Sequence, residues 1–143
     1  MQQASHALTR FFGPSDHAGT VSLDSFRRRA KRHLSIFDEL ARRQLKARGI
    51  SIPPAISLVA CPNCALTLDG EHPQREAIVE WLRQDGKIAK KFKEVEVLFE
   101  VIRAAEAPHV SVAVEYCFHV GLTSAGPVVF FETHRCADST LVE

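Results

Sequence analysis

The sequence lacks any apolar run near the ~20 residues that a helix needs to cross a bilayer. Its opening stretch, MQQASHALTRFFGPSDHAGT, also lacks the basic end and the apolar core of a secretory signal peptide. We therefore expect a cytoplasmic protein with no membrane partner. In such a chain, four cysteines favour thiols or metal ligands over disulfides.

The common short signatures of catalysis are also missing. The sequence has no phosphate-binding loop, no dinucleotide-binding fingerprint and no serine, histidine and aspartate arrangement typical of hydrolases. At 143 residues, with 45% apolar composition, the chain is long enough for one globular domain. We expect a mobile tail over residues 1–21 and a single domain over 22–143, made of a helix at 22–49 and a sheet and helix unit at 55–143.

The strongest periodic signal predicts a long helix that begins near Ser22 and ends near Gly49. Its apolar residues follow the three- and four-residue spacing of one helix face: Leu23, Phe26, Ala30, Leu34, Phe37, Ala41 and Leu45. Ser22 is a favourable residue to cap the start, and Gly49 is favourable at the end. Seven basic residues occupy the opposite face: Arg27, Arg28, Lys31, Arg32, Arg42, Arg43 and Lys46.

Charge is distributed unevenly along the chain. Residues 1–50 contain ten Lys/Arg and four Asp/Glu, whereas 51–143 contain eight and thirteen. A helix face with seven cations suits the phosphates of DNA or another nucleic acid, and binding there would follow charge and shape rather than base sequence. The alternative is that the basic segment folds back onto the acidic part of the chain.

The remaining pattern predicts an α+β fold with a mostly antiparallel sheet. We expect short strands at 55–60 and in ALTL before the Asp69–Gly70 turn, then a short helix that starts at Pro73. The alternation in EVEVLFEVI predicts a strand at 94–102, although its apolar spacing also fits a helix. With HVSVAVEYCFHV and PVVFFETHRC it would complete a C-terminal three-stranded meander.

Side-chain alternation fixes a register for the last hairpin. If Leu122 lies opposite Pro127, then Cys117 faces Glu132 and His119 faces Phe130. One face then collects apolar residues: Val112, Val114, Tyr116, Phe118, Val120, Val129 and Phe131. The other face collects side chains that can bind a metal or take part in catalysis: Glu115, Cys117, His119, Glu132, His134 and Cys136.

The stretch ACPNCALTLDG predicts half of a metal site. A redox pair sits where a strand enters a helix, but the residues after Cys64 do not favour a helix. CPNC instead resembles the knuckle of zinc ribbons, and Zn²⁺ needs about four ligands. We expect Cys61, Cys64, His134 and Cys136 to hold a structural zinc, with Cys117 and His119 as the alternative second pair; His72 is a further candidate.

The acids that follow the knuckle resemble those of the competence-protein-like nucleases, in which a zinc knuckle precedes a restriction-endonuclease-like core. The matching positions are Glu76 and Glu80 in REAIVEW, Glu96 or Glu100 in EVEVLFE, and Glu115 in VAVEYC. The resemblance implies that Glu76, Glu96 and Glu115 hold a catalytic Mg²⁺. The family's Lys or Gln two positions later is replaced by Cys117, so an inactive relative fits as well.

Three hypotheses follow from the sequence. The first is a small zinc-stabilised protein that binds nucleic acid through residues 27–46. The second is the Mg²⁺-dependent nuclease, or its inactive relative. The third is a regulator or adaptor in which the basic helix or the acidic sheet binds a protein partner, with a homodimer as one form.

Overall fold

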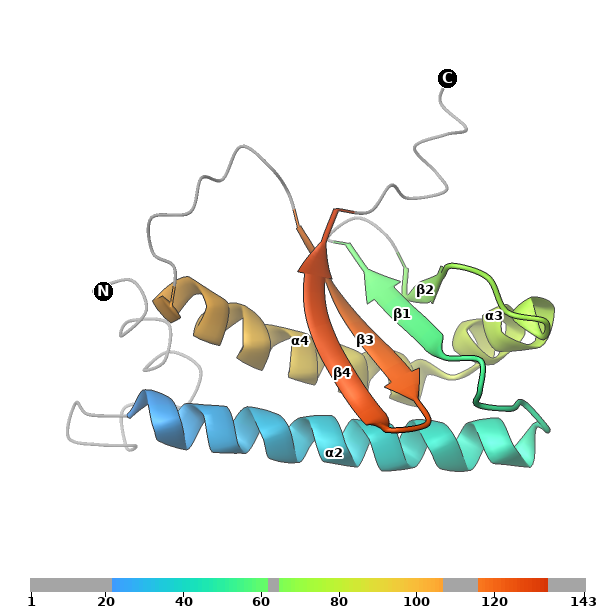
Figure 1. Ribbon diagram of the computed structural model, residues 1–143, viewed down its shortest axis with the longest axis horizontal. Helices are drawn as coiled ribbons and strands as arrows, with labels where there is room; N and C mark the ends of the chain where they lie inside the picture. Colours follow the sequence, from blue (N-terminus) through green and yellow to red (C-terminus); the bar gives the residue numbers. More distant parts are fainter. Residues whose placement is uncertain (1–21, 62–64, 107–115, 134–143) are drawn as a thin grey trace, which may run out of the picture.

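The computed structural model describes residues 22–61, 65–106 and 116–133. Within these ranges the chain forms three helices and four strands, in the order α2 (Leu23–Ala47), β1 (Ile56–Ala60), β2 (Thr67–Asp69), α3 (Arg75–Gln84), α4 (Gly86–Glu106), β3 (Cys117–Thr123) and β4 (Gly126–Glu132) (Figure 1). The predicted α+β class is confirmed. The predicted tail over residues 1–21 lies outside the described residues.

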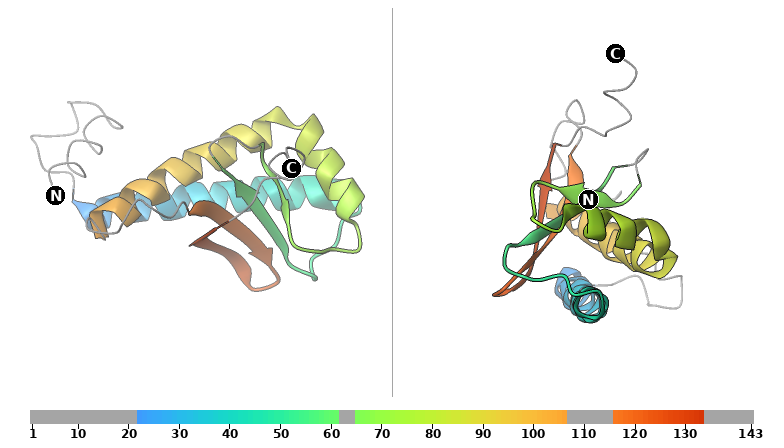
Figure 2. Two further views of the ribbon diagram at one scale, coloured as in Figure 1. Left: turned by 90° about the horizontal axis from the view of Figure 1, so that it is seen from above. Right: turned by 90° about the vertical axis from the view of Figure 1, so that its right-hand side faces the viewer.

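The four strands form one antiparallel sheet in the order β2-β1-β3-β4. All three helices lie on one side of it, so the described fold has a helical layer and a sheet layer (Figure 2). Even-numbered residues of β1 and β3, such as Leu58 and Val120, face the helices and are buried. Odd-numbered residues of the same strands face the other way, and we call that side the second face. None of the described helices is both long and apolar enough to span a membrane.

The long helix α2 matches the prediction closely. The Ser22 hydroxyl accepts a hydrogen bond of 3.0 Å from the Ser25 N–H and caps the start. At the other end, Gly49 has a positive φ of 73°, and the Ile50 N–H reaches back to the Leu45 carbonyl. Six of the seven stripe residues are buried: Phe26, Ala30, Leu34, Phe37, Ala41 and Leu45.

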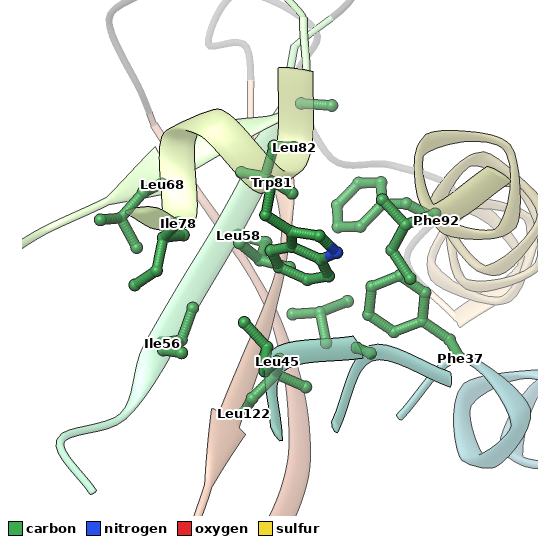
Figure 3. Close-up of a cluster of buried hydrophobic side chains, with 14 of the residues drawn as sticks. Phe37, Leu45, Ile56, Leu58, Leu68, Ile78, Trp81, Leu82, Phe92 and Leu122 are labelled. Carbon is green, nitrogen blue, oxygen red and sulfur yellow. The ribbon is translucent and has the colours of Figure 1, made fainter. Parts of the chain in front are cut away.

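The main core lies between α2, the short helix α3 and the sheet. Trp81 is fully buried at its centre, surrounded by side chains from α2, β1 and α4 (Figure 3). Its indole N–H donates a 2.7 Å hydrogen bond to Gln44 Oε1, so the one polar atom of the ring has a partner on α2. Ile78 and Leu82 complete the inner side of α3. The predicted short helix is present, although it begins at Arg75 and not at Pro73.

The predicted strand at 94–102 is wrong, because this segment belongs to the 21-residue helix α4. Its buried residues, Ile88, Phe92, Val95, Glu96, Leu98 and Ile102, follow helical spacing. The helix also includes the lysine-rich stretch KIAKKFK, which precedes this segment. Helix α4 packs against α2, where Leu98 and Ile102 meet Phe26 and Ala30 in a second cluster. Long-range packing of this apolar stripe outweighed the local strand preference of its valines.

In place of the predicted three-stranded meander, the C-terminal part of the sheet is the two-stranded hairpin of β3 and β4. Strand β3 pairs on its other side with β1, and not with a strand at 94–102. The predicted register of that hairpin is confirmed: Leu122 pairs with Pro127, His119 with Phe130, and Cys117 with Glu132. Phe118 and Val120 lie on the core side, while Cys117 and His119 lie on the second face. Residues 109–115, expected to begin this strand, lie outside the described part of the chain.

Candidate functional site

The basic face of α2 is opposite the stripe that packs into the core. Five of its cations are exposed and form no ion pair within the described ranges; they are Arg28, Lys31, Arg32, Arg43 and Lys46. They fall into two groups, one in each half of the helix. We call these five residues the α2 cation face.

The other two predicted basic residues are engaged within the molecule. Arg27 forms ion pairs with Glu106 at the end of α4 and with Asp24, and these contacts raise its pKa above the ordinary value. Arg42 binds Asp38 at 2.7 Å and donates a second 2.7 Å hydrogen bond to the carbonyl of Thr123, the last residue of β3. These two arginines fasten α2 to α4 and to the sheet.

A shallow pocket of about 390 Å³ lies where α2 ends. Leu45 and Ile50 contribute its apolar walls, while Arg42 and Lys46 bring positive charge to its rim. The pocket is continuous with one end of the α2 cation face through Lys46. The C-terminal end of α2 therefore has a recess with positively charged residues at its rim, which suits an anionic group.

The cysteines of the described residues form a disulfide. Cys61 follows β1 and Cys117 begins β3, and their sulfurs are bonded with Cα atoms 5.2 Å apart. This pairing differs from our expectation of thiols, because the antiparallel register of β1 and β3 places the two residues side by side. The predicted zinc ligands Cys64, His134 and Cys136 lie outside the described residues. Zinc ligation by Cys61 would require that this disulfide be reduced.

The second face of the sheet brings together an imidazole and two carboxylates. His119 on β3 is fully buried, and its Nε2 lies 3.1 Å from Asp69 Oδ2 at the end of β2. Glu132 at the end of β4 offers an oxygen within 4.8 Å of ligand atoms on both residues. The His119 ring also stacks on Phe130, with centroids 4.7 Å apart. We call Asp69, His119 and Glu132 the carboxylate–imidazole cluster.

Both ring nitrogens of His119 are occupied, which restricts its chemistry. Nδ1 lies 3.0 Å from the Cys117 carbonyl, and Nε2 faces Asp69. Neither nitrogen is left to activate a neighbouring serine, so His119 does not form a nucleophile triad with Ser57. The further candidate His72 is also committed, because it contacts the Ser51 carbonyl and accepts from the Gln74 N–H.

The acids of the nuclease hypothesis do not gather at one place among the described residues. Glu76 is exposed on α3, Glu96 is buried on α4, and Glu115 lies outside the described ranges. The strand that should carry the middle acid is a helix. Glu96 instead neighbours Glu100 one turn later, where partial burial and the Glu96 carboxylate raise the pKa of Glu100 to about 7.

No protein-family model, no curated protein and no solved structure matches the chain. The likeness of CPNC and the acids after it to competence-protein-like nucleases therefore stays a prediction from the motifs. The carboxylate–imidazole cluster was only partly foreseen from the sequence. Alternation places His119 and Glu132 on one face, but Asp69 before Gly70 predicts a turn, and only the β1–β2 pairing brings Asp69 to the same surface.

Proposed function

We propose that the protein binds nucleic acid through the α2 cation face. The observation that supports this most directly is that five cations on one side of a 25-residue helix lack acidic partners among the described residues. Helical pairs such as Arg42 with Asp38 show that the same helix neutralises its cations where acids are placed for it. Charges left unneutralised on one surface favour an anionic partner.

The spacing of these cations fits a polyanion better than a small anion. Arg28 and Lys46 are separated by 18 positions, which corresponds to roughly 27 Å along a helix axis. A DNA duplex presents one phosphate charge per roughly 1.7 Å of its length, so both groups of cations can meet phosphates of one duplex. The face offers arginine and lysine without Asn or Gln, so phosphates rather than base edges would be read.

The test is a binding titration of a fluorescent 20-base-pair duplex by anisotropy at several salt concentrations. We expect the wild-type affinity to fall steeply with salt, because each neutralised phosphate releases a counterion. The double variant Arg28→Glu and Arg32→Glu should bind at least tenfold more weakly and with a shallower salt dependence. Both residues are exposed on α2 and lie away from the core, so the fold should persist.

The matched control reverses two exposed lysines on another helix, Lys87→Glu and Lys90→Glu on α4. This variant has the same net charge as the double arginine variant, so it measures what a general change of charge does. We expect it to retain most of the affinity. Equal losses in the two variants, or no binding by the wild type at low salt, would reject the α2 cation face as the contact.

The proposal includes a structural Zn²⁺ held by Cys61, Cys64, His134 and Cys136. In its support, the register places Cys61, Cys117 and Glu132 in neighbouring positions at one end of the sheet. Cys64 is three positions from Cys61, and Cys136 is four positions from Glu132. A fully extended chain spans at most roughly 10–14 Å over three to four residues, so these separations are short enough for one shared site. Reduction of the disulfide would release the Cys61 thiol for this role.

A further inference from the structure

The geometry points to a second metal site, in which Asp69, His119 and Glu132 bind a divalent transition-metal ion on the second face of the sheet. This site shares no ligand with the proposed cysteine zinc, although Glu132 pairs with Cys117 at the same end of the sheet. It lies on the side of the sheet opposite the helices, away from the α2 cation face. It takes its ligands from three strands, β2, β3 and β4. The donors are one imidazole nitrogen and carboxylate oxygens, and their ligand atoms all lie within 4.8 Å of one another.

The hydrogen bonding of His119 is the first argument. A neutral imidazole has one N–H, yet both ring nitrogens of His119 face oxygen acceptors, the Cys117 carbonyl at 3.0 Å and Asp69 Oδ2 at 3.1 Å. If Nδ1 donates to the carbonyl, the lone pair of Nε2 points at a carboxylate. In that tautomer the two atoms repel each other, and a metal ion or a proton between them replaces this repulsion with attraction. Metal-binding histidines show this arrangement, with the second nitrogen fixed by a backbone carbonyl.

Charge balance is the second argument. Asp69 and Glu132 bring two negative charges close together beside a fully buried ring. A divalent ion bound between the three side chains would offset both of these charges at once. The separation of 3.1 Å between Nε2 and Oδ2 is close to the roughly 3.0–3.5 Å expected for two neighbouring ligands at 2.0–2.1 Å from one ion. Exposed Glu132 has room to close the remaining distance.

Ser57 supplies an independent observation. Its Oγ is buried and has no hydrogen-bond partner among the described residues, although buried hydroxyls are nearly always bonded. Ser57 pairs with Asp69 on one side and with Gly121 on the other, so it shares the second face with the cluster. The contact between Asp69 and His119 crosses β1 between Ser57, which pairs with Asp69, and Val59, which pairs with His119. A water bound to the metal would give this hydroxyl its missing partner.

The donor set decides which ions fit. Carboxylates suit Mg²⁺, Ca²⁺ and Mn²⁺, whereas imidazole suits Zn²⁺, Fe²⁺ and Cu²⁺. One imidazole with two carboxylates therefore favours ions that accept both donors, such as Mn²⁺, Fe²⁺ or Zn²⁺. Three protein ligands leave at least one coordination position for water or for an oxygen of another molecule.

The test is a titration of the chelator-treated, oxidised full-length protein with Mn²⁺, followed by the loss of the free-ion signal in electron paramagnetic resonance. Mn²⁺ is the probe because thiolates bind it poorly, which keeps the cysteines out of the measurement. We expect saturable binding by the wild type. Glu132→Gln and Asp69→Asn should each weaken it at least tenfold, and excess Zn²⁺ should displace the Mn²⁺ from the wild type.

Glu76→Gln is the matched control, because it removes an exposed carboxylate on α3 and should leave Mn²⁺ affinity unchanged. Circular dichroism establishes that each variant is folded, and exposed Glu132 can be changed without opening the core. Undetectable Mn²⁺ binding by the wild type at millimolar concentration would overturn the proposal. So would wild-type affinity in either folded ligand variant.

Discussion

At the scale of single residues, the neighbouring acids Glu96 and Glu100 on α4 are the most unusual charges in the described structure. Glu96 is 4% exposed, and its Oε1 lies 2.9 Å from Lys93 Nζ. The two groups form an ion pair but are not aligned as a hydrogen bond, so that oxygen has no hydrogen-bond partner among the described residues. Burial and the Glu96 charge together favour a proton on Glu100.

This carboxylate pair predicts a specific pH dependence of stability. The folded-state pKa of Glu100, about 7, lies above its ordinary value of 4.5, so the folded protein holds this proton more tightly than the unfolded chain does. The resulting stabilisation is complete at low pH and is lost as pH rises through 7. Urea midpoints at pH 5.5, 6.5 and 7.5 should fall in the wild type and fall less in Glu100→Gln. A Glu100→Gln slope equal to that of the wild type would contradict the assignment, and Glu76→Gln serves as the control.

Part of the carboxylate–imidazole cluster can be predicted from the sequence. The rest cannot, for a physical reason. Alternation along adjacent strands is a local signal, so His119 and Glu132 could be placed on one face without coordinates. Asp69 joins them from a strand 50 positions away, and Asp before Gly is usually a turn signal. Contacts of that kind depend on strand order, which the sequence pattern did not determine.

At the scale of elements, α2 was predictable and α4 was not. Every signal in α2 agrees, from its Ser22 cap to its apolar stripe and Gly49. In α4 the β-branched residues and the alternating acids favour a strand, while the spacing of Phe92, Val95, Phe99 and Ile102 favours a helix. The helix forms because that spacing packs onto α2 and the sheet.

The disulfide between β1 and β3 should contribute to the stability of the fold. Cys61 and Cys117 are 56 residues apart, so their bond restricts a long stretch of the unfolded chain. Its reduction in the presence of a chelator should cost roughly 2–4 kcal/mol of unfolding free energy. Zn²⁺ added to the reduced protein should restore much of that loss by binding at the proposed cysteine site. Thermal unfolding of the three states measures both effects.

Cys64→Ser separates the two causes, because it leaves both disulfide partners in place and removes a proposed zinc ligand. We expect this variant to match the wild type when oxidised and to gain little from Zn²⁺ when reduced. A reduced wild type that gains nothing from Zn²⁺ would argue against the cysteine site. A melting temperature that reduction leaves unchanged would argue against a stabilising disulfide.

At the scale of the whole molecule, α2 is both the proposed binding surface and a wall of the core. Phe37 is fully buried and meets Phe92 of α4 edge to face, at 5.8 Å between ring centroids. Its neighbour Ile36 is 42% exposed. The two sides of one helix therefore serve different purposes, and substitutions on them should have separable effects.

Adjacent residues on α2 test this division. Phe37→Ala should lower the free energy of unfolding by about 3–5 kcal/mol, because it leaves a cavity between α2 and α4. Ile36→Ala should change it by less than about 0.5 kcal/mol. Urea denaturation of both variants provides the measurement. Similar losses at the two positions would mean that α2 does not pack as described.

The Cys61–Cys117 bond also has a topological consequence. It ties the end of β1 to the start of β3, so the polypeptide between them, which includes β2, α3 and α4, is a covalently closed ring. A protease that cuts this ring once cannot release either piece until the bond is reduced. The oxidised molecule can thus be nicked there and still retain every segment that it needs to refold.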